Sequence, residues 1–113
     1  MANNTTSKVV LTNKNYLAEA KMRNHFAVID EPVKAGGDDN GPTPVEYLLT
    51  AIGGCVSITL RMYAERKGWD VGKIKVIVSQ KEEQTSEGIK KSLVEEITFS
   101  KEITEDQRKR LLV

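Results

Sequence analysis

The chain has 113 residues, 39% of them apolar and 29% charged, which is the length and composition of one ordinary globular domain. Its formal net charge is +1, so the sequence lacks the basic excess that indicates nucleic-acid binding. The single cysteine cannot form an internal disulfide and no signal-like segment opens the chain, so we expect a cytoplasmic protein with one domain over residues 1–113. Residues 1–7, MANNTTS, are expected to be disordered.

Three short strands are expected in the first third of the chain. The stretches SKVVLT (7–12), YLAEAKM (16–22) and NHFAVID (24–30) are apolar or alternate between apolar and polar residues, and a polar cluster separates the first two. This spacing predicts an antiparallel meander. The next stretch, EPVKAGGDDNGP (31–42), is rich in glycine and proline and predicts a loop.

A long helix is expected over residues 43–67. The stretch TPVE has the pattern of a capping box, in which the Thr43 hydroxyl accepts from the amide of Glu46 and the Glu46 carboxylate accepts from the amide of Thr43. Pro44 suits the first helical position because its φ is already helical. At the other end, two basic residues complement the helix dipole, and Gly68 stands where a left-handed cap belongs.

This helix is too long, and apolar on too many sides, to be covered by the rest of one small domain. At 1.5 Å per residue its length would be about 37 Å, whereas a 100-residue domain has a radius of gyration of about 13 Å. We therefore expect a second copy of the chain to cover the remaining side, which predicts a homodimer. The uncharged run from Tyr47 to Leu60 is shorter than the span of about 20 residues that a bilayer requires, so no membrane segment is expected. Gly53 and Gly54, both costly inside a helix, indicate a kink or a close approach.

Two further strands and a short helix complete the expected elements. The strands are GKIKVIVSQKEE (72–83) and KKSLVEEITFSKEI (90–103), with a hairpin loop at 85–90. Thr104 and Gln107 repeat the capping-box pattern and open a terminal helix, which ends as a frayed end or as a truncated form of a longer chain. The order of these elements predicts an α+β fold.

Cys55 follows the two glycines and has two interpretations. A buried free cysteine commonly serves as a small core hydrophobe. Alternatively, its thiolate is a nucleophile and needs a nearby cation, because Cys55 lies about three turns inside the helix, too far for the dipole. The candidate cations are Arg23, Arg61 and Lys34, of which Arg61 lies on a different helical face from Cys55.

Glu46 also has two interpretations, as the acid of the capping box and as a carboxylate that orients a cation. No metal or other cofactor is expected. One histidine, His25, and one cysteine are too few for a structural zinc site, and Asp38, Asp39 and Asn40 lack the spacing of a calcium loop.

The stretches HFAVIDEP, GPTPVEYLLTAIGGC and LRMYAERKGWDV together resemble the OsmC/Ohr superfamily of osmotically induced and organic-hydroperoxide-resistance proteins. The similarity runs from about residue 23 to the end of the chain. It rests on the Asp-Glu-Pro and double-glycine loop, the Pro-x-Glu-x-Leu-Leu helix start, and the Gly-Cys centre followed by Tyr-Ala-x-x-Lys-Gly.

The resemblance implies an α+β fold in which two chains intertwine around paired central helices. It also implies that Cys55 is a peroxidatic cysteine, which attacks the O–O bond of an organic hydroperoxide and becomes a sulfenic acid. Glu46 then corresponds to the glutamate that holds an arginine against the thiolate, and Arg23, in the N-terminal strand region, is the candidate for that arginine.

In the resembled family a second cysteine, in a Cys-Pro segment after the terminal helix, resolves the sulfenic acid as a disulfide. This chain ends before such a segment, so the C-terminal part of the family domain is expected to be missing. An external dithiol is then expected to act as the reductant.

Two hypotheses about function remain open. The first is a thiol-dependent peroxidase that reduces organic hydroperoxides in oxidative-stress defence. The second is a noncatalytic homodimer of the same fold that binds a small apolar ligand or serves a structural role, with Cys55 in the core. Thiol reactivity separates them, because only the first requires alkylation of Cys55 well below about pH 8.5.

Overall fold

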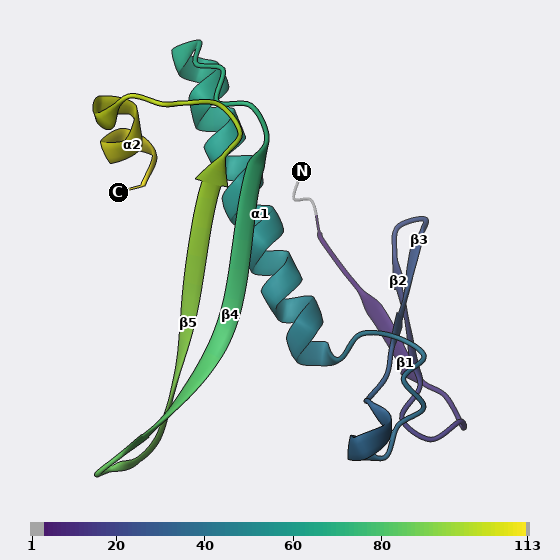
Figure 1. Ribbon diagram of the computed structural model, residues 1–113. Helices are drawn as coiled ribbons and strands as arrows, with labels where there is room; N and C mark the ends of the chain where they lie inside the picture. The colour runs from purple at the N-terminus through teal and green to yellow at the C-terminus, as the bar shows by residue number, and fades with distance from the viewer. Residues whose placement is uncertain (1–3, 113) are drawn as a thin grey trace. The chain divides into compact units, whose positions relative to one another are not determined.

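The computed structural model describes residues 4–112, so the predicted disorder of residues 1–7 lies partly outside the described residues. Residues 4–7 are exposed and have no regular secondary structure. The chain divides into two compact units, residues 1–47 and residues 48–113, and each contains one antiparallel sheet (Figure 1). A single domain over the whole chain stays a prediction.

Three antiparallel strands form the sheet of the first unit, in the order β1-β2-β3 (Figure 1). They are β1 (Lys8–Leu11), β2 (Ala18–Met22) and β3 (His25–Ile29), which confirms the predicted meander. Arg23 and Asn24 form the turn between β2 and β3. Arg23 has a φ of 55°, in the left-handed region that costs a non-glycine residue about 1–2 kcal/mol.

The loop after β3 is organised by one buried carboxylate. Asp30 is 1% exposed, and its side chain accepts hydrogen bonds from the backbone amides of Glu31 at 2.7 Å and Asn40 at 3.0 Å. Its own amide donates to the carbonyl of Pro42 at 3.1 Å. A short 3₁₀ helix, η1 (Val33–Ala35), lies within the loop. The predicted loop is therefore held by specific hydrogen bonds at both of its ends.

These amides give Asp30 a pH-dependent role in stability. The backbone amide of Asn40 is the largest of the influences that hold the pKa of this carboxyl below its ordinary value of 3.8, and they outweigh the opposing effect of burial. A depressed folded-state pKa means that the carboxylate stabilises the fold above the unfolded pKa, and that this stabilisation is lost as pH falls through the folded pKa.

We expect Asp30→Asn to lower the free energy of unfolding at neutral pH, and the difference from the native chain to shrink below about pH 4. Denaturant unfolding of both chains at pH 7 and pH 3 measures this difference. A penalty of equal size at the two pH values would show that the charge of Asp30 contributes nothing.

Gly41 lies too close to β3 for any side chain to fit. A Cβ at this position would lie 2.4 Å from the carbonyl oxygen of Val28. Gly41→Ala is therefore expected to displace the loop or β3 and to lower the free energy of unfolding by about 2 kcal/mol or more, as measured by denaturant titration. Gly54→Ala is the control, because a Cβ there meets nothing within 4 Å and alanine favours the helix by about 1 kcal/mol. Equal losses in the two variants would contradict the close approach.

The long helix α1 (Pro44–Lys67) has the predicted bounds to within one residue. Its capping box is present, with the Thr43 amide donating to the Glu46 carboxylate at 2.8 Å and the Glu46 amide donating to the Thr43 hydroxyl at 3.1 Å. At the other end Gly68 has a φ of 73°, and the helix closes as predicted.

The second unit contains most of α1, the hairpin of β4 (Ile74–Thr85) and β5 (Gly88–Phe99), and α2 (Glu105–Leu111) (Figure 1). The two strands pair from Ile74 with Phe99 to Thr85 with Gly88, so the turn is tighter than the predicted loop over residues 85–90. The second predicted capping box, at the start of α2, is also present. The core of this unit consists of Leu60, Ala64, Val71 and Leu111.

Much of the long helix is uncovered in the single chain, as expected for a helix that the rest of one small domain cannot cover. Within α1, all of which is described, only Leu60 and Ala64 are buried. The reason is that the hairpin and α2 cover one side of the helix in the second unit and leave its other apolar residues uncovered.

Candidate functional site

Cys55, the chain's only cysteine, is exposed on α1. The face of α1 that carries Gly53 lies against β4, because a Cβ on Gly53 would be 3.5 Å from Cγ2 of Val78. Two residues along a helix rotate the side-chain direction by about 200°, so Cys55 points away from this strand. The interpretation of Cys55 as a core residue is therefore wrong for the single chain.

Cys55 occupies the middle of an exposed stripe on α1. The other members are mainly apolar and are exposed as well, and the stripe comprises Leu48, Ala51, Cys55, Ile58 and Met62. These positions are alternately three and four residues apart, which is the spacing of a seam where one helix packs along another. We call this set the Cys55 stripe.

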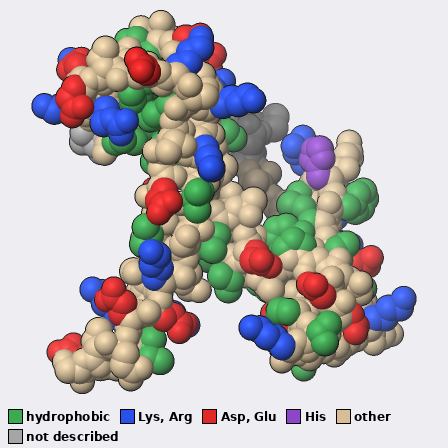
Figure 2. Space-filling model, in the orientation of Figure 1, with side chains coloured by type: hydrophobic (Ala, Val, Ile, Leu, Met, Phe, Trp, Pro, Cys, Tyr) green, Lys and Arg blue, Asp and Glu red, His purple; other side chains and the backbone are tan. Residues whose placement is uncertain are grey.

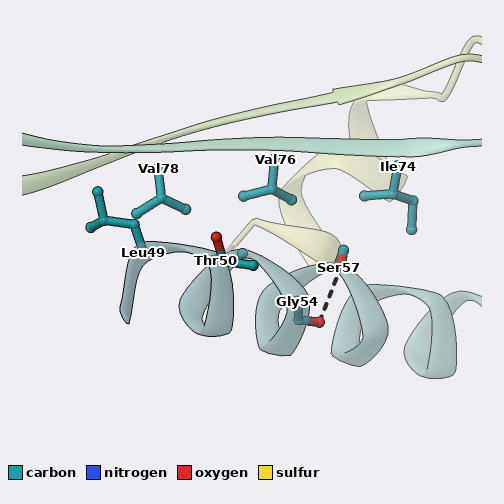
Figure 3. Close-up of a pocket in the computed structure, with 8 residues that line it drawn as sticks. Leu49, Thr50, Gly54, Ser57, Ile74, Val76 and Val78 are labelled. Carbon is teal, nitrogen blue, oxygen red and sulfur yellow. Dashed lines mark hydrogen bonds between the residues drawn. The ribbon is translucent and has the colours of Figure 1, made fainter. Parts of the chain in front are cut away.

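A groove of about 440 Å³ runs between α1 and β4, on the other side of the helix (Figure 3). Ile74, Val76 and Val78 of β4 point toward the helix in Figure 3. The described residues that line it are Leu49, Thr50, Gly53, Gly54, Ser57, Ile74, Val76 and Val78. Cys55 is not among these lining residues, although its neighbour Gly54 is.

The two glycines do not interrupt the helix. α1 is continuous through Gly53 and Gly54, so no helix end is created beside Cys55. The Ser57 hydroxyl donates to the carbonyl of Gly54 at 3.1 Å, one turn earlier (Figure 3). A Cβ on Gly53 would make only an ordinary van der Waals contact with Val78, and one on Gly54 would meet nothing within 4 Å, so neither glycine is required by a close approach, and the helix is unbroken at both.

The predicted cations lie in different places. Arg61 donates to the carbonyl of Gly72 at 2.5 Å and so is engaged with the segment before β4. Lys34 lies in η1, and Arg23 lies in the turn between β2 and β3. Arg23 and Glu46 thus belong to the first unit, and Cys55 belongs to the second. The contact of Arg23 with the Cys55 thiolate stays a prediction.

Glu46 serves as the acid of the capping box, since its carboxylate accepts from the amide of Thr43 at 2.8 Å. A carboxylate has about four acceptor positions, so this bond is compatible with a second partner. The role of Glu46 as a residue that orients a cation stays a prediction.

Sequence reasoning missed a contact next to Glu46. The hydroxyl of Tyr47 donates to the backbone carbonyl of Val28, in β3, at 2.7 Å. A tyrosine directly after the capping-box glutamate was the only signal in the sequence, and it gave no indication of which strand the hydroxyl would reach.

Among residues 4–112 no group of three or more His, Cys, Asp or Glu side chains is arranged to hold a metal ion. An 18-residue window of α1 has a mean hydropathy of 1.3, so this helix is long and apolar enough to cross a membrane by these two measures. One helix of this kind is weak evidence for a membrane span.

Comparison with known proteins adds to this geometry. The family model described as "OsmC-like protein" matches residues 36–113 of the chain. The chain belongs to the OsmC-like family. A comparison with curated proteins found no match.

Solved structures show the same OsmC-like fold. A putative osmotic stress induced and detoxification response protein from Psychrobacter arcticus aligns with a TM-score of 0.78 at 21% identity, over 98% of this chain and 81% of that one. An OsmC-like protein from Mycoplasma pneumoniae aligns with a TM-score of 0.71 at 19% identity, over 98% and 79%. A Legionella pneumophila protein, described as an organic hydroperoxide resistance protein OsmC, aligns with a TM-score of 0.69 at 13% identity, over 98% and 80%. At these identities the similarity shows the fold, and the predicted α+β class is confirmed.

Proposed function

We propose that this OsmC-like chain is a thiol-dependent peroxidase that reduces organic hydroperoxides, with Cys55 as its nucleophile. The observation that carries the proposal is the exposure of the only cysteine at the centre of an apolar helix surface, where a thiolate can meet an apolar substrate. The Legionella relative's description as an organic hydroperoxide resistance protein supports the same chemistry.

In the proposed reaction the Cys55 thiolate attacks one oxygen of the O–O bond. The sulfur gains that oxygen and becomes a sulfenic acid, while the other oxygen leaves as an alkoxide and takes up a proton to give the alcohol. An external thiol then condenses with the sulfenic acid to give a mixed disulfide and water. A second external thiol attacks the mixed disulfide, which restores the Cys55 thiol and releases the oxidised reductant. A small dithiol supplies both thiols from one molecule.

Arg23 is proposed to stabilise the thiolate and Glu46 to orient Arg23. The place of Arg23 supports this role, since it lies in the turn at the start of β3, the strand that the first turn of α1 contacts. The capping bond supports the role of Glu46, because it holds the carboxylate in one position on the first helical turn.

We propose that the working unit is a homodimer in which a second copy packs on the apolar members of the Cys55 stripe and leaves the Cys55 sulfur accessible to a small substrate. Uncovered apolar side chains in both units support a partner of this kind, and several reach the surface around the three-stranded sheet (Figure 2). The exposed members of that sheet include Val9, Val10, Leu11 and Phe26. A two-stranded hairpin such as β4–β5 is also marginal in water without further packing. We further propose a cytoplasmic location, where dithiol reductants are maintained, and no nucleic-acid or membrane partner.

The apolar neighbours of Cys55 favour an alkyl or aryl hydroperoxide over hydrogen peroxide as substrate. Consumption of cumene hydroperoxide by the native chain and by Cys55→Ser, with dithiothreitol or dihydrolipoamide as reductant, tests the proposal. The second candidate function, binding of a small apolar ligand without catalysis, is favoured by the groove between α1 and β4. Turnover that depends on Cys55 would exclude it as the sole function.

A further inference from the structure

We propose that Tyr47 is a positioning residue for Glu46, and that its hydroxyl fixes the first turn of α1 against β3. The inference rests on the proposed function, because it concerns the placement of the glutamate assigned there. All of the contacts that carry it lie within residues 1–47.

Tyr47 joins the helix start to the sheet through two hydrogen bonds. Its amide donates to the carbonyl of Thr43 at 3.1 Å, which closes the first helical turn. Its hydroxyl donates to the carbonyl of Val28 at 2.7 Å. β3 is an edge strand, so backbone groups on its outer side lack a strand partner, and the phenol supplies one. One side chain thus links the turn that carries Glu46 to the strand.

Independent contacts converge on the same place. Gly41 approaches the carbonyl of Val28 so closely that a Cβ would lie 2.4 Å from the oxygen. The amide of Asp30 donates to the carbonyl of Pro42 at 3.1 Å, so the residues just before the helix are also tied to the end of β3. Tyr47 therefore belongs to a set of contacts that defines where α1 begins relative to the strand.

The position of Glu46 relative to β3 affects its position relative to Arg23, because β3 connects Val28 to the turn that contains Arg23. Arg23 lies in the turn just before β3, and Val28 lies near the other end of β3. The capping box holds the Glu46 carboxylate on the first turn of α1, and Tyr47 holds this turn on β3. Loss of the phenol hydroxyl would allow the carboxylate to shift relative to the strand that leads from Arg23, without removing any charged group.

Tyr47→Phe tests this inference, because it removes one hydroxyl and keeps the ring. We expect kcat/KM for cumene hydroperoxide to fall between about twofold and tenfold, which corresponds to the loss of one hydrogen bond. We also expect the pH at which Cys55 is half-alkylated by iodoacetamide to rise, and the melting temperature to fall by a few degrees, as the loss of one hydrogen bond predicts. Tyr16→Phe, at an exposed tyrosine outside this set of contacts, is the control and should match the native chain in both readouts.

Comparison with Glu46→Gln separates failure of the inference from failure of the proposed function. If Glu46→Gln lowers turnover and raises the alkylation pH while Tyr47→Phe behaves like Tyr16→Phe, the positioning role is wrong and the peroxidase proposal stands. If the native chain consumes no hydroperoxide, the peroxidase proposal fails, and hydrogen exchange of the amides in the first turn of α1 decides the inference. Faster exchange in Tyr47→Phe than in Tyr16→Phe would support the anchoring role, and equal exchange would overturn it.

Discussion

Cys55→Ser is expected to abolish the dithiol-dependent consumption of cumene hydroperoxide. A serine hydroxyl is almost fully protonated at neutral pH and does not form a species like a sulfenic acid, so the rate should fall by at least about a thousandfold, to that of dithiol and peroxide alone. The measurement is the loss of hydroperoxide over time at fixed dithiol concentration. Mass spectrometry of the native chain after one equivalent of peroxide without dithiol should show one added oxygen on Cys55.

The control for this prediction moves the thiol instead of removing it. Thr59 is exposed on α1, one helical turn after Cys55, so the double variant Cys55→Ser, Thr59→Cys presents a surface thiol on the same helix. We expect this variant to be as inactive as Cys55→Ser. Native-like turnover by the double variant would mean that any exposed thiol suffices, and turnover by Cys55→Ser itself would exclude Cys55 as the nucleophile.

Ile58→Glu and Met62→Glu are expected to dissociate the proposed homodimer. Both side chains are 58% exposed in the single chain and belong to the Cys55 stripe. Burial of one such side chain contributes about 1.5–3 kcal/mol, and a symmetric interface contains each position twice, so one substitution should weaken association by about 3–6 kcal/mol. This corresponds to a rise in the dimer dissociation constant of between about a hundredfold and ten-thousandfold, measured by light scattering across a dilution series.

Val33→Glu is the matched control for the dimer prediction. Val33 is 71% exposed and lies in η1, so the substitution places the same charge on an exposed apolar residue outside the Cys55 stripe. The mass of this variant in solution should equal that of the native chain. A native chain that is already a stable folded monomer would rule out the homodimer, whatever the variants do.

The sequence predicted the elements well because their signals are local. Thr43 with Glu46, and Thr104 with Gln107, form capping boxes within one helical turn, so the start of each helix could be inferred from four consecutive residues. Gly68 marked the end of α1 in the same way. The turn between β4 and β5 was predicted too long, because the polar residues near a hairpin tip do not reveal how far strand pairing continues. The strand predicted to reach Ile103 ends at Phe99, and the 3₁₀ helix in the loop after β3 was not predicted.

The candidate site depended on contacts that the sequence does not encode locally. The sequence left open whether Cys55 is a core residue or a nucleophile. Its exposure in the single chain follows from which helical face meets β4, and this depends on residues about twenty positions later in the chain. Arg61 was a candidate cation until the structure paired it with the carbonyl of Gly72. The bond between Tyr47 and Val28 spans nineteen residues, so no local pattern could predict it.

Because Cys55 lies at the centre of its stripe, the concentration of the protein is expected to affect the oxidation of this thiol through dimer formation. If a second copy packs on the apolar members of this stripe, the helix surface that joins two chains also limits access to the nucleophile to small substrates. Dilution would then expose both together, and the separated chains would carry open thiols that over-oxidise irreversibly. The concentration of the chain in the cell would in this way set the fraction of Cys55 thiols that is protected from irreversible over-oxidation and the fraction that is lost to it.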